Sequence, residues 1–167
     1  LKIAMGAWIE RDADANAREL ATLVERALAG EVDVAVVGNE VLHRRDMEVA
    51  DLVELIELFR SQVPNIPVTT AEVYSHWMEY PELVAACDYV LIQSYPFWDG
   101  IAVDQAVGAL HAQYYQVVDK AMGKPVWVSE TGWPSDGSMV GDAVPSAFNA
   151  AFYFLNVAAW SQALEIP

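Results

Sequence analysis

Short β-rich runs alternate with longer stretches of helical period along the whole chain, and this alternation restricts the possible folds strongly. The expected strands cover residues 3–9, 32–37, 68–70, 89–92 and 126–128. The expected helices cover residues 13–28, 47–63, 82–86, 103–122 and 146–160. Such an alternation predicts an α/β fold in which βα units surround a parallel sheet.

The expected strands are nearly continuous apolar runs, such as Val-Ala-Val-Val at 34–37. Strands covered on both faces have this pattern, so a barrel and a doubly wound sheet both qualify. Polar and aromatic residues follow these runs, and function gathered at the carboxyl ends of many strands is typical of the (β/α)8 barrel. No Gly-x-Gly-x-x-Gly motif follows the first run, which argues against a dinucleotide-binding sheet. We therefore predict a fold of the (β/α)8 TIM-barrel type, with about five βα units in this chain.

Length and charge limit the domain count and the kinds of partner. A chain of 167 residues that is 54% hydrophobic can build one sizeable core, so we predict a single domain over residues 1–167. The formal net charge of -15 argues against binding to nucleic acid or anionic lipid, because such partners need clustered Lys and Arg. No apolar run approaches the roughly 20 residues that span a bilayer. A neutral substrate fits this composition better.

Cysteine and histidine give no sign of a disulfide or a metal site. Cys87 is the single cysteine, and its apolar neighbours favour a buried, inert thiol. His43, His76 and His111 lack ligand-like spacing such as the i, i+4 pair of a zinc helix. We therefore expect no metal and no cofactor.

Two glutamates stand where an expected strand opens into its loop. Glu40 ends the segment Val-Val-Gly-Asn-Glu at 36–40, and Glu130 follows the run at 126–128. In a retaining glycosidase one carboxyl protonates the departing sugar oxygen and another attacks the anomeric carbon, so the two must converge from different strands. The alternative is that both carboxylates merely cap neighbouring helices or pair with Arg44 and Arg45.

Three segments, taken in order, resemble glycoside hydrolase family 17, the β-1,3-glucanases and related glucanosyltransferases of clan A. They are Val-Gly-Asn-Glu at 37–40, Tyr-Pro-Phe-Trp at 95–98 and Ser-Glu-Thr-Gly-Trp-Pro-Ser at 129–135. Both glutamate motifs follow an expected strand, and two further βα units separate them. The segments 69–72 and 141–146 look more like the bacterial branch of the family, where transglycosylases occur.

The resemblance implies a retaining hydrolase or transglycosylase that acts on β-1,3-glucan through a covalent glycosyl-enzyme. Glu40 then matches the general acid/base and Glu130 the nucleophile. Asn39 matches a residue whose amide bonds the 2-hydroxyl of the sugar under attack. Tyr95 matches one whose hydroxyl bonds the nucleophile, with a core tyrosine as the alternative.

This chemistry sets two geometric expectations for the glutamates. The acid must hold its proton near neutrality while the nucleophile stays ionised, so Glu40 should be the less solvated of the pair. Their carboxyls should lie about 5 to 5.5 Å apart, the spacing that suits a covalent intermediate.

A sugar cleft also needs aromatic platforms with a polar rim, because pyranose rings present apolar C–H faces. Trp133, Phe97 and Trp98 fit this need, and we expect them to contact substrate. Glu72 ends a strand and could bond sugar hydroxyls, with a surface salt bridge as an equal alternative.

The chain departs from the family in its number of strands. A family 17 barrel has eight βα units, whereas the five expected here correspond to a barrel without its first two strands and its last. An open sheet would have two raw edges, which proteins usually cover, charge or pair. The chain would then be a fragment, half of an assembly, or a reduced barrel that closes by self-association. A noncatalytic glucan-binding or structural remnant is the alternative to an enzyme, and the substrate class suggests a secreted or periplasmic protein.

Overall fold

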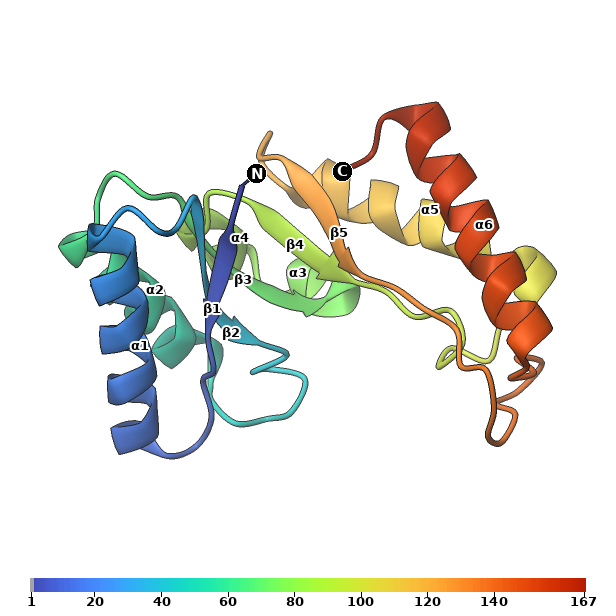
Figure 1. The fold of residues 1–167 in the computed structure, drawn as a ribbon, viewed down its shortest axis with the longest axis horizontal. Coiled ribbons are helices and arrows are strands. Elements are labelled where there is room, and N and C mark those ends of the chain that lie inside the picture. Colours follow the sequence, from blue (N-terminus) through green and yellow to red (C-terminus); the bar gives the residue numbers. More distant parts are fainter. Residues whose placement is uncertain (1) are drawn as a thin grey trace.

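Residues 2–167, described by a computed structural model, form one curved parallel sheet flanked by helices (Figure 1). Within these residues the strand order is β1-β2-β3-β4-β5, and every neighbouring pair is parallel. The strands are β1 (Ala4–Ala7), β2 (Val34–Asn39), β3 (Val68–Val73), β4 (Val90–Gln93) and β5 (Val126–Glu130). A doubly wound sheet reverses its order at a switch point, whereas a barrel adds strands in sequence. The order therefore confirms the barrel-type prediction.

The helices lie along the outside of the sheet in the order of the chain. They are α1 (Ala13–Leu28), α2 (Val49–Gln62), α3 (Tyr74–Glu79), α4 (Pro81–Ala86), α5 (Val103–Lys120) and α6 (Ala147–Leu164). Figure 1 shows α1 and α2 beside β1 and β2 at one end of the sheet, and α5, with α6 packed on it, at the β5 end. Each connection thus returns the chain to the amino end of the next strand, as βα units require.

Local sequence explains where α1 begins and which face of α2 packs on the sheet. The Asp12 carboxylate accepts hydrogen bonds from the backbone N–H groups of Asp14 and Ala15, which caps the first turn of α1. On α2, Leu52, Ile56 and Phe59 recur at helical spacing and are fully buried against the sheet. These residues form the packing face of α2.

The middle of the sheet is buried on both faces. All four residues of β4 are buried, and β3 is buried from Val68 to Glu72. Cys87 is buried next to this core, and burial raises the pKa of its thiol to about 11. The prediction that Cys87 is buried is confirmed.

The sequence predicts neither α3 nor the full length of β3. It predicts a strand over residues 68–70 and no helix between that strand and residue 82, whereas β3 runs to Val73 and continues directly into α3. The helix is only six residues long, too short for a 3.6-residue period to show. Tertiary packing stabilises it, because Trp77 is buried and its indole N–H donates to the carbonyl of Leu91 at 3.0 Å.

The two ends of the sheet differ. Among the described residues, β1 pairs with β2 alone and leaves its outer edge open. On the outer edge of β5, the Val128 N–H donates to the Pro167 carbonyl at 3.1 Å. Helix α6, next to β5, buries Tyr153 but exposes large apolar side chains, including Phe148 (76%) and Phe154 (70%). None of the helices described has the length and apolar character needed to span a membrane.

Candidate active site

Polar side chains gather where the central strands end. Asn39 ends β2 and Glu40 follows it, Gln93 ends β4 and Glu130 ends β5. Because the strands are parallel, their carboxyl ends meet at the same edge of the sheet, which is where barrel enzymes place their active sites. The prediction that both glutamates stand where a strand opens into its loop is confirmed.

A distortion of β2 presents Asn39 and Glu40 at this edge. The pairing of β2 with β3 shifts register between Val36 and Asn39, and Gly38 has φ +86°. Glu40 also lies in the left-handed region, with φ +53°, which is unusual for a residue with a side chain. A Cβ on Gly38 would stand 2.5 Å from Cγ2 of the buried Val41. Only glycine fits this point of the turn without strain.

Replacing Gly38 by alanine should therefore destabilise the fold. A left-handed alanine costs about 1–2 kcal/mol, and overpacking against Val41 adds about 1–3 kcal/mol. At about 2–4 °C per kcal/mol for a chain of this size, the Tm should fall by about 5–15 °C in a thermal melt. Gly108→Ala is the matched control, because Gly108 lies within α5 with open space around it. That control should leave the Tm unchanged or raise it. A Tm for Gly38→Ala equal to that of the unmodified chain would contradict the expected strain at Gly38.

Glu40 and Glu130 line one pocket of about 450 Å³, together with His43, Val73, Tyr95 and Trp98. Glu40 is half-buried and Glu130 is exposed, so Glu40 is the less solvated of the two, as expected. Among the described residues neither carboxylate forms an ion pair, since Arg44 pairs with Asp46 instead. Both glutamates therefore face a shared space of the size that small ligands occupy.

Two donors hold the Glu130 carboxylate from opposite oxygens. Nε2 of Gln93 donates to Oε1 at 2.8 Å, and the Tyr95 hydroxyl donates to Oε2 at 2.7 Å. Burial, followed by the bond to Glu130, raises the pKa of Tyr95, so its hydroxyl stays protonated and remains a donor at ordinary pH. These bonds fix the orientation of the carboxylate and stabilise its negative charge, while a carboxylate has lone pairs to spare for an incoming electrophile.

Gln93 is a site residue that the sequence reading missed. It is fully buried, and its Nε2 also donates to Oδ1 of Asn39 at 2.6 Å, so one amide group connects the ends of β2 and β5. Since Oδ1 of Asn39 is occupied, its Nδ2 is left to donate to another group. A signal was available, because a polar residue closes the otherwise apolar run at 89–92.

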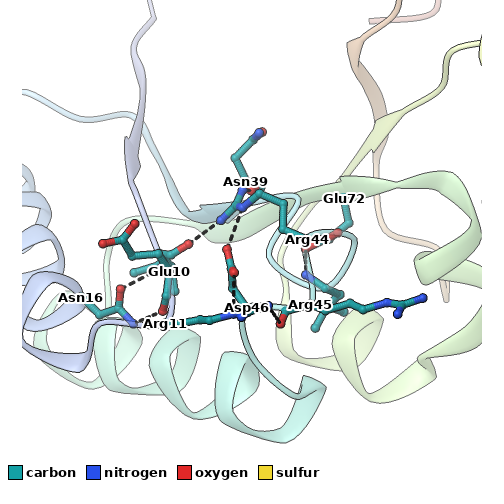
Figure 2. Close-up of polar contacts among 10 residues, drawn as sticks. Glu10, Arg11, Asn16, Asn39, Arg44, Arg45, Asp46 and Glu72 are labelled. Atoms are coloured by element: carbon teal, nitrogen blue, oxygen red, sulfur yellow. Dashed lines mark hydrogen bonds and ion pairs between the residues drawn. The ribbon is translucent and has the colours of Figure 1, made fainter.

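Arg44 supports the backbone of the same strand end. Its guanidinium donates to the carbonyl oxygens of Asn39 and of Ile9, the latter at 2.6 Å, and pairs with Asp46 at 2.8 Å (Figure 2). It also lies 4.3 Å from the centre of the Trp8 ring, a cation–π contact. The arginine therefore ties the ends of β1 and β2 together behind the site.

Glu72 is expected from the sequence either to bond sugar hydroxyls or to form a surface salt bridge, and both expectations are wrong. Its side chain is fully buried, and Oε1 accepts a hydrogen bond from the Leu42 N–H at 2.9 Å. It can reach neither a sugar hydroxyl nor a surface cation. The reason is that β3 lies in the middle of the sheet and the loop after β2 covers its end.

The aromatic residues divide into exposed and supporting positions. Trp98 is 67% exposed and lines the pocket, as a sugar platform should. The expectation that Phe97 is a platform is wrong, because its ring is 2% exposed and packs edge-on against Trp98 and Trp133. Trp133 is half-buried, and its indole N–H donates to the Val144 carbonyl at 3.0 Å. A sugar contact by Trp133 stays a prediction.

Proteins of known name resemble this chain over nearly its full length. A β-1,3-glucanosyltransferase of Rhizomucor miehei, solved as an active-site mutant in complex with laminaritriose, superposes with a TM-score of 0.90 at 33% identity. The match covers 99% of this chain and 63% of that one. A glucan 1,3-beta-glucosidase, BGL2, of Candida albicans is 29% identical over 171 residues, which is 90% of this chain and 56% of the relative. This chain thus spans a little over half the length of such relatives.

The family model that matches the chain agrees with these likenesses. A probable glucan endo-1,3-beta-glucosidase, btgC, of Aspergillus flavus is 28% identical over 82% of this chain and 22% of its own length. The relatives named are fungal, so the expected bacterial affiliation finds no support. The model of the BtgE/BtgC glycoside hydrolase domain matches residues 1–165, and the chain belongs to that family, which is of the glycoside hydrolase family 17 type.

Proposed function

We propose that this chain carries the catalytic centre of a retaining glycoside hydrolase or transglycosylase that acts on β-1,3-glucan. The observation that carries the proposal is the shared pocket of Glu40 and Glu130, which reach it from the ends of two non-adjacent strands, β2 and β5. Its relatives include a named glucosidase and a named glucanosyltransferase, the latter solved with laminaritriose. Residues 1–167 are proposed to act as one domain of catalytic type.

In the proposed first step, an oxygen of Glu130 attacks the anomeric carbon while Glu40 donates its proton to the glycosidic oxygen. The bond between the anomeric carbon and that oxygen breaks, the shortened glucan leaves as an alcohol, and a glycosyl ester forms on Glu130. In the second step, Glu40 takes a proton from water or from a sugar hydroxyl, which attacks the same carbon and releases Glu130. The carboxyl separation of about 5 to 5.5 Å that this mechanism needs is part of the proposal.

Neighbouring side chains have supporting roles in the proposal. The free Nδ2 of Asn39 donates to the 2-hydroxyl of the sugar, a bond that strengthens in the transition state. Tyr95 and Gln93 orient Glu130, and Trp98 offers an exposed ring to the apolar face of a glucose unit. Trp133 is proposed to extend this aromatic wall beyond Trp98.

Replacing Tyr95 by phenylalanine should lower kcat with little change in KM. The change removes one hydrogen bond to a charged oxygen, worth about 1.5–3 kcal/mol, so kcat should fall about 10- to 100-fold. Initial rates with laminaritriose over a range of concentrations would measure it. Tyr115→Phe, on the exposed face of α5, is the matched control and should keep the full rate. An unchanged kcat for Tyr95→Phe would remove Tyr95 from the machinery.

A noncatalytic glucan-binding or structural role is the second candidate. The open outer edge of β1 among the described residues favours it, because an incomplete wall holds a substrate less firmly.

Self-association is a further proposal, in which the open edge or the exposed apolar side chains of α6 meet a second copy. Sedimentation velocity over a range of concentrations would detect such a dimer.

Incubation with laminaritriose separates the candidates. Glucose and laminaribiose as products indicate hydrolysis, and oligosaccharides longer than three units indicate transfer; chromatography and mass spectrometry distinguish them. The anomeric configuration of the first product, followed by NMR, should be that of the substrate, and an inverted product would contradict the covalent mechanism. Calorimetric binding without turnover would favour the second candidate, and neither binding nor turnover would contradict both.

A further inference from the structure

Glu72 is a buried carboxyl next to the site that the proposed reaction does not use. Its side chain has no exposed surface, and Oε1 accepts a hydrogen bond from the Leu42 N–H at 2.9 Å. The N–H groups of Val41 and His43 also act on this carboxyl, while Oε2 has no partner among the described residues. Burying a carboxyl costs free energy unless hydrogen bonds compensate for lost hydration. The hydrogen bond that the carboxyl accepts comes from the loop after β2.

That loop is the one that presents Glu40. Residues 41–43 follow Glu40 directly, and the left-handed conformation of Glu40 needs support from its surroundings. The Glu40 N–H donates to the carbonyl of Ala71 at 2.8 Å, and its carbonyl accepts from the Arg44 N–H at 2.8 Å. Two adjacent residues of β3, Ala71 and Glu72, thus hold the backbone on both sides of Glu40. Figure 2 shows the Glu72 side chain of β3 beside the loop that carries Arg44 and Arg45.

The charge of Glu72 is also linked to that of Glu40. Burial raises the pKa of Glu72 to about 7, the backbone amides of the loop oppose this rise, and the charge of Glu40 adds to it. The Glu72 carboxyl therefore lies within electrostatic reach of the Glu40 carboxyl, beside the loop that Glu72 anchors.

We propose that Glu72 is a positioning residue for the general acid/base: its carboxyl anchors the loop that follows Glu40 through the Leu42 N–H and thereby fixes the backbone of Glu40. The catalytic part of this inference rests on the proposed function. The anchoring and the coupling between the two carboxyls do not, and a measurement without substrate tests them.

Two substitutions separate anchoring from charge. Glu72→Gln keeps an oxygen that can accept from the Leu42 N–H but removes the charge, whereas Glu72→Met keeps only the bulk. Misplacing a catalytic group by about 1 Å can cost about 100-fold, so Glu72→Met should lower kcat with laminaritriose by about that factor while KM stays within about twofold. Glu72→Gln should lower kcat several-fold and lose the part of its pH profile that titrates near neutrality. Glu54→Gln, on the exposed face of α2, is the matched control.

A rise in KM with unchanged kcat in either variant would overturn the proposal, because it would indicate a sugar contact instead. Unchanged kcat and pH profile in both variants would overturn it as well. Thermal melts report whether Glu72→Met folds, and Glu72→Gln keeps the test available if it does not.

The readout without substrate is the NMR titration of the Leu42 amide. In the unmodified chain its chemical shifts should follow a titration with a midpoint near neutral pH, and Glu72→Gln should abolish that titration. In Glu40→Gln the midpoint should move to lower pH, because the charge that helps to raise the pKa of Glu72 is gone. Chemical shifts of the Leu42 amide that show no titration, or a midpoint that is the same in Glu40→Gln as in the unmodified chain, would overturn the inference. Absence of turnover with the expected titration would instead refute the proposed function alone.

Discussion

Replacing Glu130 by glutamine should abolish turnover of β-1,3-glucan. The amide oxygen is too weak a nucleophile to attack the anomeric carbon, so no glycosyl ester forms. Loss of a covalent nucleophile in other enzymes costs up to about 10⁶-fold in kcat, and we expect a loss of about 10⁴-fold or more here. The measurement is the initial rate of oligosaccharide release, with Glu54→Gln as a control for the loss of one negative charge at an exposed position.

The covalent intermediate provides a second readout for Glu130. A substrate with a good leaving group, quenched during turnover, should add the mass of its glycosyl group to the peptide that contains Glu130, and Glu130→Gln should show no such adduct. The fold should survive the change, because the new amide oxygen can accept from Nε2 of Gln93 while its NH2 group donates to the Tyr95 hydroxyl. A variant that keeps more than a few per cent of the rate, or an adduct on another residue, would show that Glu130 is not the nucleophile.

Replacing Glu40 by glutamine should produce a loss that depends on the leaving group. A positioned general acid contributes about 10²–10⁴-fold, so kcat with β-1,3-glucan should fall by about that factor. An aryl β-glucoside whose phenol leaves without protonation needs no acid in the first step, so formation of the glycosyl-enzyme should be nearly normal in this variant. Burst kinetics with such a substrate would show rapid release of phenol followed by slow turnover.

The contrast between the two glutamine variants is the decisive comparison. Glu130→Gln should fail with both the natural and the activated substrate, whereas Glu40→Gln should fail with the natural one and still give a burst with the activated one. Equal losses for Glu40→Gln on both substrates would contradict its role as acid/base. The reverse pattern would exchange the two roles while leaving the shared pocket as the site.

Much of the fold could be predicted because it depends on local periodicity. Helix α1 was predicted with the bounds that it has, and the strands were found where apolar runs end in polar residues. The same logic placed Glu40 and Glu130 at strand ends, since the carboxyl end of a strand can be read from the change in composition. Helix α3 was missed because its six residues are held by the burial of Trp77, which is a long-range contact.

The site residues that were wrong or missed share a physical cause. Glu72 and Phe97 each occupy a position that local pattern cannot distinguish from its exposed counterparts, and contacts with residues far away in the sequence contribute to the burial of both and of Gln93. The loop after β2 covers Glu72, and the rings of Trp98 and Trp133 cover Phe97. Gln93 matters because it lies between Asn39 and Glu130, which are 91 positions apart.

Composition and the order of apolar and polar residues were thus sufficient for the parallel βα architecture, the strand ends and the two glutamates, because side-chain periodicity is a property of neighbouring residues. Only the tertiary structure decided that Glu40 and Glu130 line the pocket and that the Glu72 carboxyl is buried. That selection depends on the central place of β3 in the sheet and on the left-handed turn at Gly38, which moves Glu40 into the pocket and closes its loop over Glu72. These are contacts between segments that lie far apart in the sequence, so the sequence of a single strand does not reveal them.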